Sequence, residues 1–201
     1  MKNEKITIKV PGSCGELAQG MLDGNYFHIT CPINLFSYIS VKSSKKVETL
    51  PNKWKSRKAA EKTLKFLGER KNLKIQIDSQ LPTCCGMASS TADIVGVCLG
   101  VAKLLEKQIS DDNISEVALS IEPSDGIMFK GIVLFDHRKG ELKEYLGSPP
   151  KIKILVIDLG IRENTIRFNK MNFSKEHLYN GKKIEKAVEL IKKGIKEKNY
   201  Q

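Results

Sequence analysis

"LPTCCGMASSTAD", residues Leu81 to Asp93, is the most informative segment of this sequence. A loop with a proline at its start passes through Gly86, reaches Ser89, Ser90 and Thr91, and then enters a long apolar run. A glycine-containing turn that opens a helix presents unpaired backbone N–H groups and the positive end of the helix dipole, and together these bind phosphate. One hydroxyl would be enough to cap the helix. Three consecutive hydroxyls therefore favour a ligand, either phosphate oxygens or a magnesium ion.

The loop differs from two other phosphate-binding motifs. No lysine follows Gly86, so the Walker pattern does not fit, and the dinucleotide fingerprint does not fit either. The residues after the loop predict a helix from Ala88 to Lys107 that is apolar nearly all round and therefore central and buried. Gly96 and Gly100 would let another backbone pass close to this helix.

The segments before the loop predict strands and one helix. Alternating apolar and polar residues predict strands at Lys5–Val10, Leu35–Val41 and Leu73–Ile77. The turn residues Asp23-Gly24-Asn25 predict a hairpin between Glu16–Met21 and Tyr26–Thr30. A lysine-rich amphipathic helix is expected after Pro51 and Asn52, with one face formed by Trp54, Ala60, Leu64 and Leu67.

The segments after the buried helix predict a short helix, two strands and a boundary. The helix is expected at Ile114–Ile121, capped by Asn113 with Glu116 and stopped before Pro123. The strands are expected at Met128–Asp136 and Glu141–Leu146, joined by a turn at His137–Gly140. "GSPPK" (Gly147 to Lys151) reads as a boundary, followed by a strand at Ile152–Asp158 and a basic helix at Lys182–Lys198.

The composition describes a basic globular chain. It has 201 residues, 40% of them hydrophobic and 28% charged, with 34 Lys and Arg against 23 Asp and Glu. The charge of +11 would suit an anionic partner. The lysines are spread without the interleaved aromatic residues that single-stranded nucleic acid needs, so we expect a solvated surface and no nucleic acid partner.

The cysteines and the N-terminus predict a cytoplasmic protein. The five cysteines are odd in number and form no C-x-x-C pair, which indicates neither a disulfide framework nor a zinc knuckle. We expect them to be small, partly buried hydrophobes. The opening "MKNEKITIKV" lacks an apolar signal core, and no apolar run approaches membrane-spanning length, so no membrane association is expected.

Four motifs in order resemble one enzyme superfamily. The quoted loop resembles the second motif of the GHMP kinases (galactokinase, homoserine, mevalonate and phosphomevalonate kinases), P-x-x-x-G-[LM]-[GA]-S-S-[AT]-A. "PGSCGELAQG" (Pro11 to Gly20) looks like a shortened first motif. With "TCPIN" (Thr30 to Asn34) and "EPSDGIMFKGIVLFDH" (Glu122 to His137), the chain is similar to the L-threonine kinase subfamily of cobalamin synthesis, over about residues 5 to 170.

This resemblance implies an α/β two-layer fold with two domains. Residues 1–148 would form the GHMP-kinase-type N-terminal, ATP-binding domain, and residues 149–201 the beginning of a ferredoxin-like C-terminal domain. The family's third motif, a glycine-rich loop, is not found before Gln201. We therefore expect a truncated chain, or one completed by another chain.

The resemblance also implies roles for individual residues. ATP would bind at the loop residues Pro82, Gly86, Met87, Ala88, Ser89, Ser90 and Thr91. Ser90 and Glu122 would hold Mg²⁺, and Asp125 would activate the substrate hydroxyl, although "PSDG" would also stabilise a turn by itself.

These motifs identify the residues that would bind the acceptor less clearly than those that would bind ATP. Glu16 would bind the ammonium group of L-threonine, or be an ordinary strand-edge carboxylate. Cys31 and Pro32 would shape the acceptor pocket, with core packing as the alternative, and His28 is expected to be structural.

The implied reaction is phosphorylation of the L-threonine hydroxyl by ATP and Mg²⁺, giving O-phospho-L-threonine for the aminopropanol linker of cobalamin. Ser13 stands where mevalonate kinases carry a lysine after Pro-Gly, which argues against mevalonate as substrate. Two alternatives stay open: another small hydroxylated acceptor such as homoserine, and a nucleotide-binding fragment that acts only with a partner chain.

Overall fold

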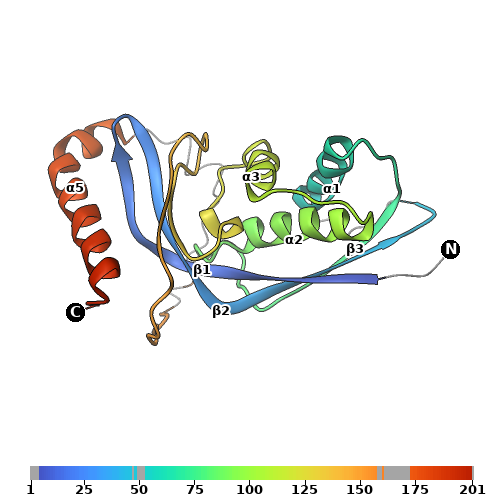
Figure 1. The fold of residues 1–201 in the computed structure, drawn as a ribbon, viewed down its shortest axis with the longest axis horizontal. Helices are drawn as coiled ribbons and strands as arrows, with labels where there is room; N and C mark the ends of the chain where they lie inside the picture. Colours follow the sequence, from blue (N-terminus) through green and yellow to red (C-terminus); the bar gives the residue numbers. More distant parts are fainter. Residues whose placement is uncertain (1–4, 47, 49–52, 158–159, 161–172, 201) are drawn as a thin grey trace.

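A long antiparallel hairpin forms the frame of the molecule in the computed structural model, which describes residues 5–46, 48, 53–157, 160 and 173–200. Strands β1 (Lys5–Leu22) and β2 (Asn25–Ser43) run side by side along the whole molecule (Figure 1). Asp23 and Gly24 join them with φ angles of 48° and 81°, so the predicted hairpin turn is confirmed. Such angles match the twist of the flanking strands in a two-residue turn.

Two further strands pair with the two halves of β2, and a third extends the five-stranded antiparallel sheet beyond them. β3 (Leu73–Ser79) pairs with the second half, at Ser37–Ser43. β4 (Ile132–Phe135) pairs with the first half, at His28–Thr30, and β5 (Lys143–Gly147) lies beyond β4.

The prediction of separate short strands in the hairpin was wrong. The segment around Pro11 and Gly15 stays in β1, because irregularities in the pairing between Pro11 and Gln19 absorb the extra residues. Bulges of this kind bend and twist a strand without ending it. Pro11 is tolerated because β1 lies at the edge of the sheet, where a strand donates fewer ladder hydrogen bonds.

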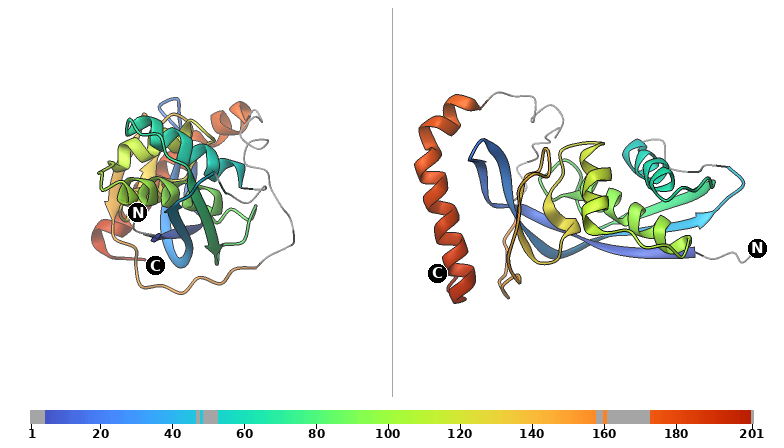
Figure 2. Two further views of the ribbon diagram at one scale, coloured as in Figure 1. Left: turned by 90° about the vertical axis from the view of Figure 1, so that its right-hand side faces the viewer. Right: turned by 45° about the horizontal axis from the view of Figure 1, so that its top comes forward.

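Helix α2 (Ser89–Leu104) is the centre of the core, as predicted. It lies between the sheet and helices α1 (Trp54–Phe66) and α3 (Asp111–Leu119) (Figures 1 and 2). Gly96 and Gly100 face β2, but the groups that pass close to them are the side chains of Ile39 and Val41 rather than a backbone.

Several predicted ends and faces differ from the structure. α2 ends at Leu104, short of Lys107, and α3 begins at Asp111 because Ser110 accepts the N–H of Asn113. Ala60 is buried, and Leu64 and Leu67 pack against the core as predicted, but Trp54 at the start of α1 is 43% exposed and departs from the predicted face. Pro51 and Asn52 lie outside the described residues.

The segment from Gly126 to Phe135 is shorter in β-structure than predicted. Gly126–Met128 forms a 3₁₀ turn, η1, and Gly131 has a φ angle of +83° before β4 begins. That left-handed conformation interrupts the strand that was expected from Met128. β5 likewise runs from Lys143 to Gly147 and not from Glu141.

The region after the "GSPPK" boundary contains one long helix. Residues 152–157 form no strand and pair with none of the described strands, so the strand prediction is wrong over these residues; Asp158 lies outside the described residues. α5 (Ser174–Glu197) starts eight residues before the predicted Lys182, since Gly181 costs a helix interior only about 1 kcal/mol and does not end it.

Helix α5 packs across the turn end of the hairpin (Figures 1 and 2). Its apolar residues Val188 and Ile195 join Phe27 and Ile132 in a second core cluster, separate from the one around α2. A Cβ on Gly20 of β1 would lie 2.8 Å from Ile184 Cδ1, so this glycine allows the close contact.

Candidate active site

The glycine-containing loop before α2 is held open by backbone conformation. Cys84, Gly86 and Ala88 have φ angles of 60°, 67° and 54°, all in the left-handed region. Ala88 is the N-cap of α2, and no side chain caps this helix end. The first N–H groups of α2 therefore face the mouth of the helix without a capping hydroxyl, as an anion site requires.

The bulged part of β1 supports this loop. The backbone N–H of Ser13 donates to Met87 O at 3.3 Å, and that of Gly15 donates to Gly86 O at 3.0 Å. A Cβ on Gly12 would come within 2.4 Å of Leu81 Cδ2 and 2.7 Å of Met87 O. Gly12 of "PGSCG" thus lets β1 approach the loop, which joins the first two sequence motifs in space.

The three consecutive hydroxyls after the loop have different environments. Ser89 is partly exposed at the helix mouth. Ser90 donates its hydroxyl to Glu122 Oε1, from the segment after α3. Thr91 is buried, and its Oγ1 accepts the backbone N–H of Asp125 at 3.4 Å. The helix mouth is therefore tied to the carboxylate of Glu122 and to the backbone of Asp125.

Glu122 is a buried carboxylate with a partner on each oxygen. Its side chain is 1% exposed, and Lys55 Nζ on the first turn of α1 lies 2.5 Å from Oε2. Ser90 occupies Oε1. A hydroxyl and a carboxylate beside the open mouth of α2 form an oxygen donor set that suits Mg²⁺. The residues present therefore fit the metal role that the sequence predicts for Ser90 and Glu122.

Asp125 belongs to a second cluster of ionisable groups. His28 Nδ1 on β2 lies 3.2 Å from Asp125 Oδ1 and 3.8 Å from Glu16 Oε1 on β1. The Thr30 hydroxyl donates to Glu16 Oε2 at 3.0 Å. One ligand atom from each of Glu16, His28 and Asp125 lies within 4.8 Å of the others.

Burial and a neighbouring charge change the acidity of Glu16. Burial, reinforced by the negative charge of Asp125, raises the pKa of Glu16 well above its ordinary range. Burial, and then the charge of Glu16, also raises the pKa of the Cys31 thiol. Glu16 is thus a carboxyl group that would gain from a cation placed next to it.

One cavity brings these groups together. Its volume is about 630 Å³, and it is lined by the loop residues Gly86 to Thr91, by Glu122 to Asp125, and by Glu16 and His28. Lys53 and Lys55 line it on the side of α1. An opening of this size can hold most of a small ligand with a few convergent polar groups.

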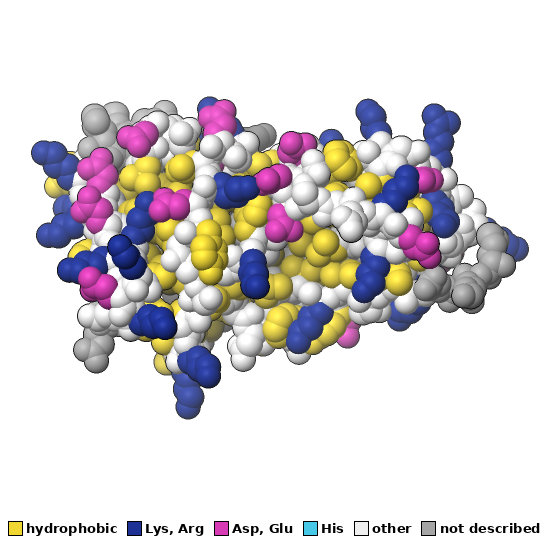
Figure 3. Space-filling model, viewed as in Figure 1, with side chains coloured by type: hydrophobic (Ala, Val, Ile, Leu, Met, Phe, Trp, Pro, Cys, Tyr) yellow, Lys and Arg dark blue, Asp and Glu magenta, His cyan; other side chains and the backbone are white. Residues whose placement is uncertain are grey.

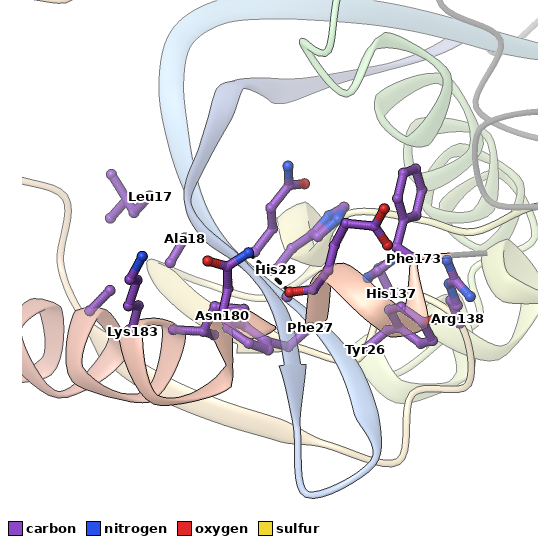
Figure 4. A pocket seen from close by; sticks show the side chains of 15 residues that line it. Leu17, Ala18, Tyr26, Phe27, His28, His137, Arg138, Phe173, Asn180 and Lys183 are labelled. Carbon is purple, nitrogen blue, oxygen red and sulfur yellow. Dashed lines mark hydrogen bonds between the residues drawn. The ribbon is translucent and has the colours of Figure 1, made fainter. Parts of the chain in front are cut away.

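A second cavity lies next to the first (Figure 4). Its volume is about 590 Å³, and it lies between the turn end of the hairpin and α5. Lys183 and Arg138 line it, and the guanidinium carbon of Arg138 lies 3.5 Å from the Tyr26 ring centroid. His28 and His137 line both cavities, and their rings stack at 3.7 Å. The two cavities therefore meet at this pair of imidazole rings.

Most of the residues singled out from the sequence meet at the first cavity. Pro82 is exposed and lies outside the lining of this cavity. Cys31 and Pro32 also lie outside the lining. Cys31 packs against the second core cluster, as the core alternative for it expects. The ATP, metal and acceptor roles of all these residues stay predictions.

The sequence analysis missed several residues of the site. Nothing distinguishes Lys53 and Lys55 from the other lysines of that segment. Asp93 was detectable as a lone carboxylate in an apolar helix; it accepts Ser37 Oγ at 2.7 Å and Lys53 Nζ at 2.6 Å. His28 was expected to be structural, yet it lies against Asp125 at the wall of the cavity.

Among the described residues, the cysteines join no second cluster of metal-ligating side chains. All five cysteines are free, as predicted, but Cys84 is exposed, contrary to the expectation for the group. Lysine and arginine side chains are scattered among acidic ones on the face seen in Figure 3. None of the helices in the described part of the chain has the length and apolar character needed to span a bilayer.

Comparisons with known proteins agree with this fold. Residues 55–130 match the family of GHMP kinases, N terminal domain. The chain is 26% identical to L-threonine kinase of Salmonella typhimurium over 95% of this chain and 65% of the relative. It is 29% identical to L-threonine kinase of Citrobacter freundii over 74% of this chain and 52% of the relative.

A solved structure shows the same fold. A mevalonate kinase crystal structure superposes with a TM-score of 0.66 and 18% identity, over 94% of this chain and 73% of that one. The two L-threonine kinases are longer than this chain, which spans about two thirds of the Salmonella protein and about half of the Citrobacter one.

Proposed function

Because residues 55–130 match the N-terminal domain family of the GHMP kinases, we propose that the protein transfers the terminal phosphoryl group of ATP to the side-chain hydroxyl of L-threonine. One observation carries the proposal: the open helix mouth at Gly86–Ser90 faces two carboxylates, Glu122 and Asp125, across a single cavity. Phosphoryl transfer needs charge neutralisation, in-line positioning and a group that orients the attacking hydroxyl. The two L-threonine kinase relatives support this acceptor.

Each residue has a distinct part in this reaction. The N–H groups at the start of α2 and the Ser89 hydroxyl hold the phosphates of ATP. Ser90 and Glu122 hold Mg²⁺, which when bound neutralises charge on the phosphoryl oxygens. Asp125 orients the threonine hydroxyl and accepts its proton. The new O–P bond forms as the bond to the bridging oxygen of ADP breaks, and ADP leaves.

The acceptor is held by the cluster beyond Asp125. Glu16 is a largely buried carboxylate, with its side chain 9% exposed, that a cation would stabilise, and an α-ammonium group is such a cation. Glu16 and Asp125 present ligand atoms within 4.8 Å of each other. In L-threonine the ammonium and hydroxyl groups sit on adjacent carbons, so one molecule can reach both carboxylates.

The product, O-phospho-L-threonine, is proposed to serve the aminopropanol linker of cobalamin. We place the protein in the cytoplasm, where ATP is available and where five free thiols are stable. Homoserine is the alternative acceptor within the same class. A nucleotide-binding chain that acts only with a partner is the alternative in another class.

The testing experiment measures ADP release with L-threonine, L-homoserine and L-serine, with ³¹P NMR of the product. L-Threonine should stimulate ADP release most, and serine less, because the missing methyl group is worth about 1–3 kcal/mol in an apolar pocket. A preference for homoserine would replace the acceptor and keep the kinase. Nucleotide binding without turnover for any of the three amino acids would favour the partner-dependent chain.

A further inference from the structure

Lys55 occupies one oxygen of the carboxylate that the proposed function assigns to magnesium. Its Nζ lies 2.5 Å from Glu122 Oε2, and the side chain of Glu122 is 1% exposed. A carboxylate buried to this degree needs a positive partner, because an isolated buried charge is very costly. In this arrangement that partner is Lys55.

Lys55 also lies within the cavity that contains the phosphate loop. It is on the first turn of α1, its side chain is 26% exposed, and it lines the cavity together with Gly86 and Ser89. A long, flexible ammonium side chain at a cavity wall can change partner by rotation of its stem. An anion bound at the mouth of the loop would therefore also attract the Lys55 ammonium group.

We propose that Lys55 binds the phosphates of a nucleotide, and that it pairs with Glu122 when no nucleotide is bound. Its ammonium group neutralises Glu122 in the arrangement described, and the triphosphate of a bound nucleotide is its alternative partner. A divalent cation and Lys55 compete for the same carboxylate oxygen. This inference rests on the proposed nucleotide and metal roles of the site, and it does not depend on the identity of the acceptor.

This competition predicts that removal of the Lys55 charge changes the affinities for metal and for nucleotide in opposite directions. Removal of the Lys55 charge should strengthen divalent cation binding at Glu122, because a positive competitor is lost. The same change should weaken nucleotide binding in the absence of metal, because a charge-assisted contact to phosphate is lost. A residue that only anchors α1 would not move the two affinities in opposite directions.

The chain offers a specific reporter and a matched control. Trp54 is its single tryptophan, it lines the cavity, and Lys55 Nζ lies 5.9 Å from its ring centroid. Lys58 is on the same helix, 6.0 Å from the same ring, and is exposed outside the cavity lining. Lys58→Met therefore removes the same charge from α1 without touching Glu122.

The experiment titrates Mn²⁺ by electron paramagnetic resonance and ATP in EDTA by Trp54 fluorescence. Relative to wild type and Lys58→Met, Lys55→Met should bind Mn²⁺ about tenfold more tightly and ATP about ten- to a hundredfold more weakly. Glu122→Gln should abolish the Mn²⁺ site, which separates it from other acidic groups. Lys55→Met affinities equal to those of Lys58→Met, in either titration, would overturn the proposal.

A second pair of variants avoids an uncompensated buried charge. Glu122→Gln releases Lys55 and removes a negative charge from the cavity, so ATP in EDTA should bind more tightly than to wild type. Adding Lys55→Met to Glu122→Gln should remove this gain. If Glu122→Gln binds ATP no better than the double variant, Lys55 does not bind phosphate. Neither titration uses threonine, so failure of the acceptor assignment leaves this test intact.

Discussion

Gly96 of α2 lies directly against Ile39 of β2: a Cβ built on this glycine would be 2.3 Å from Ile39 Cδ1 and 2.7 Å from Cγ1. Ile39 is fully buried, and Gly96 is in the most buried part of α2. The position therefore sets how closely α2 approaches the sheet. It also fixes where the mouth of α2 lies relative to the bulged part of β1.

Gly96→Ala should lower the free energy of unfolding by about 1–3 kcal/mol, because an added methyl group in a packed core forces neighbours to move. The matched control is Gly181→Ala in α5, where a Cβ would meet nothing within 4 Å. That change should stabilise the protein by about 0.5–1 kcal/mol, since alanine is the better helix former. Urea unfolding of both variants checks this, and equal effects of the two would contradict it.

The loop conformation should decide nucleotide affinity. Gly86 has a φ angle of +67° with open space around it, so alanine meets no clash but carries the backbone cost of the left-handed region, about 1–2 kcal/mol. Gly86→Ala should weaken ATP binding and Gly86→Val should weaken it further, because a branched Cβ is stiffer. Ser90→Ala should weaken binding of the magnesium complex. Trp54 fluorescence measures all three.

Gly24→Ala is the control for these variants. Gly24 also has a positive φ, of +81°, with nothing within 4 Å, but it lies in the hairpin turn and outside the cavity. The substitution carries a similar backbone cost and should leave ATP affinity unchanged. Equal ATP affinities of wild type, Gly86→Val and Ser90→Ala would remove the loop from the nucleotide site.

Glu16 should make stability depend on pH in an unusual direction. Burial and the charge of Asp125 raise the pKa of Glu16 in the folded protein above its ordinary value of 4.5. At a pH between 4.5 and the pKa of the folded state, the folded protein therefore holds a proton that the unfolded chain releases. The contribution of Glu16 to stability is therefore full below about pH 4.5 and is lost as the pH rises through the folded pKa. Glu16→Gln should raise the Tm at pH 7.5 and change it little at pH 4.

Glu48 provides a control of opposite sign. Hydrogen bonds from Lys74 and Ser44 lower the pKa of Glu48, so its contribution is present above pH 4.5 and is lost as the pH falls. Glu48→Gln should therefore lower the Tm slightly at pH 7.5, because an ion pair that is partly open to solvent contributes little. Thermal unfolding between pH 4 and pH 8 follows both variants. A lower Tm for Glu16→Gln at pH 7.5 would contradict the prediction for Glu16.

Local sequence signals predicted the elements well but not their continuity. The loop from Leu81 and the buried helix after it were evident, because glycine, hydroxyls and an apolar run occur together within a few residues. The fusion of the short strands into β1 and β2 was not, since proline and glycine usually end a strand. Pairing partners supplied by the rest of the sheet keep the chain extended through Pro11 and Gly15.

The site was predictable where a motif carried it and hidden where it depended on tertiary contact. Glu122 and Asp125 were identified from "EPSD", whereas the pairing of Glu122 with Lys55 joins residues 67 positions apart. His28 is 97 positions from Asp125 and lies in no recognised motif. Such pairs follow from the register of β2 and the packing of α1, which periodicity alone does not determine.

Asp125 should affect turnover with little effect on nucleotide binding. If it accepts the proton of the acceptor hydroxyl, Asp125→Asn should depress turnover by roughly 10²–10⁴-fold. The amide keeps the size of the side chain and can still bond His28 Nδ1, while the backbone N–H of residue 125 still donates to Thr91 Oγ1. What is lost is the negative charge that makes the group a base.

Two further variants separate this role from the alternatives. Glu122→Gln should raise the Mg²⁺ concentration needed for half-maximal turnover, because a metal ligand is lost. Asp136→Asn tests a purely structural aspartate: Asp136 is buried and accepts the backbone N–H groups of Arg138 and Lys139 in the turn after β4. It should lower the Tm and leave turnover per folded molecule unchanged.

The measurement is turnover with L-threonine at saturating ATP across a magnesium titration, with the folded fraction of each variant determined by circular dichroism. Asp125→Asn should differ from Asp136→Asn in turnover, and from Glu122→Gln in showing no recovery at high magnesium. Should Asp125→Asn behave like Asp136→Asn, the "PSDG" segment acts only as a turn. Proton transfer from the acceptor hydroxyl to a phosphate oxygen of the nucleotide would then be the favoured route.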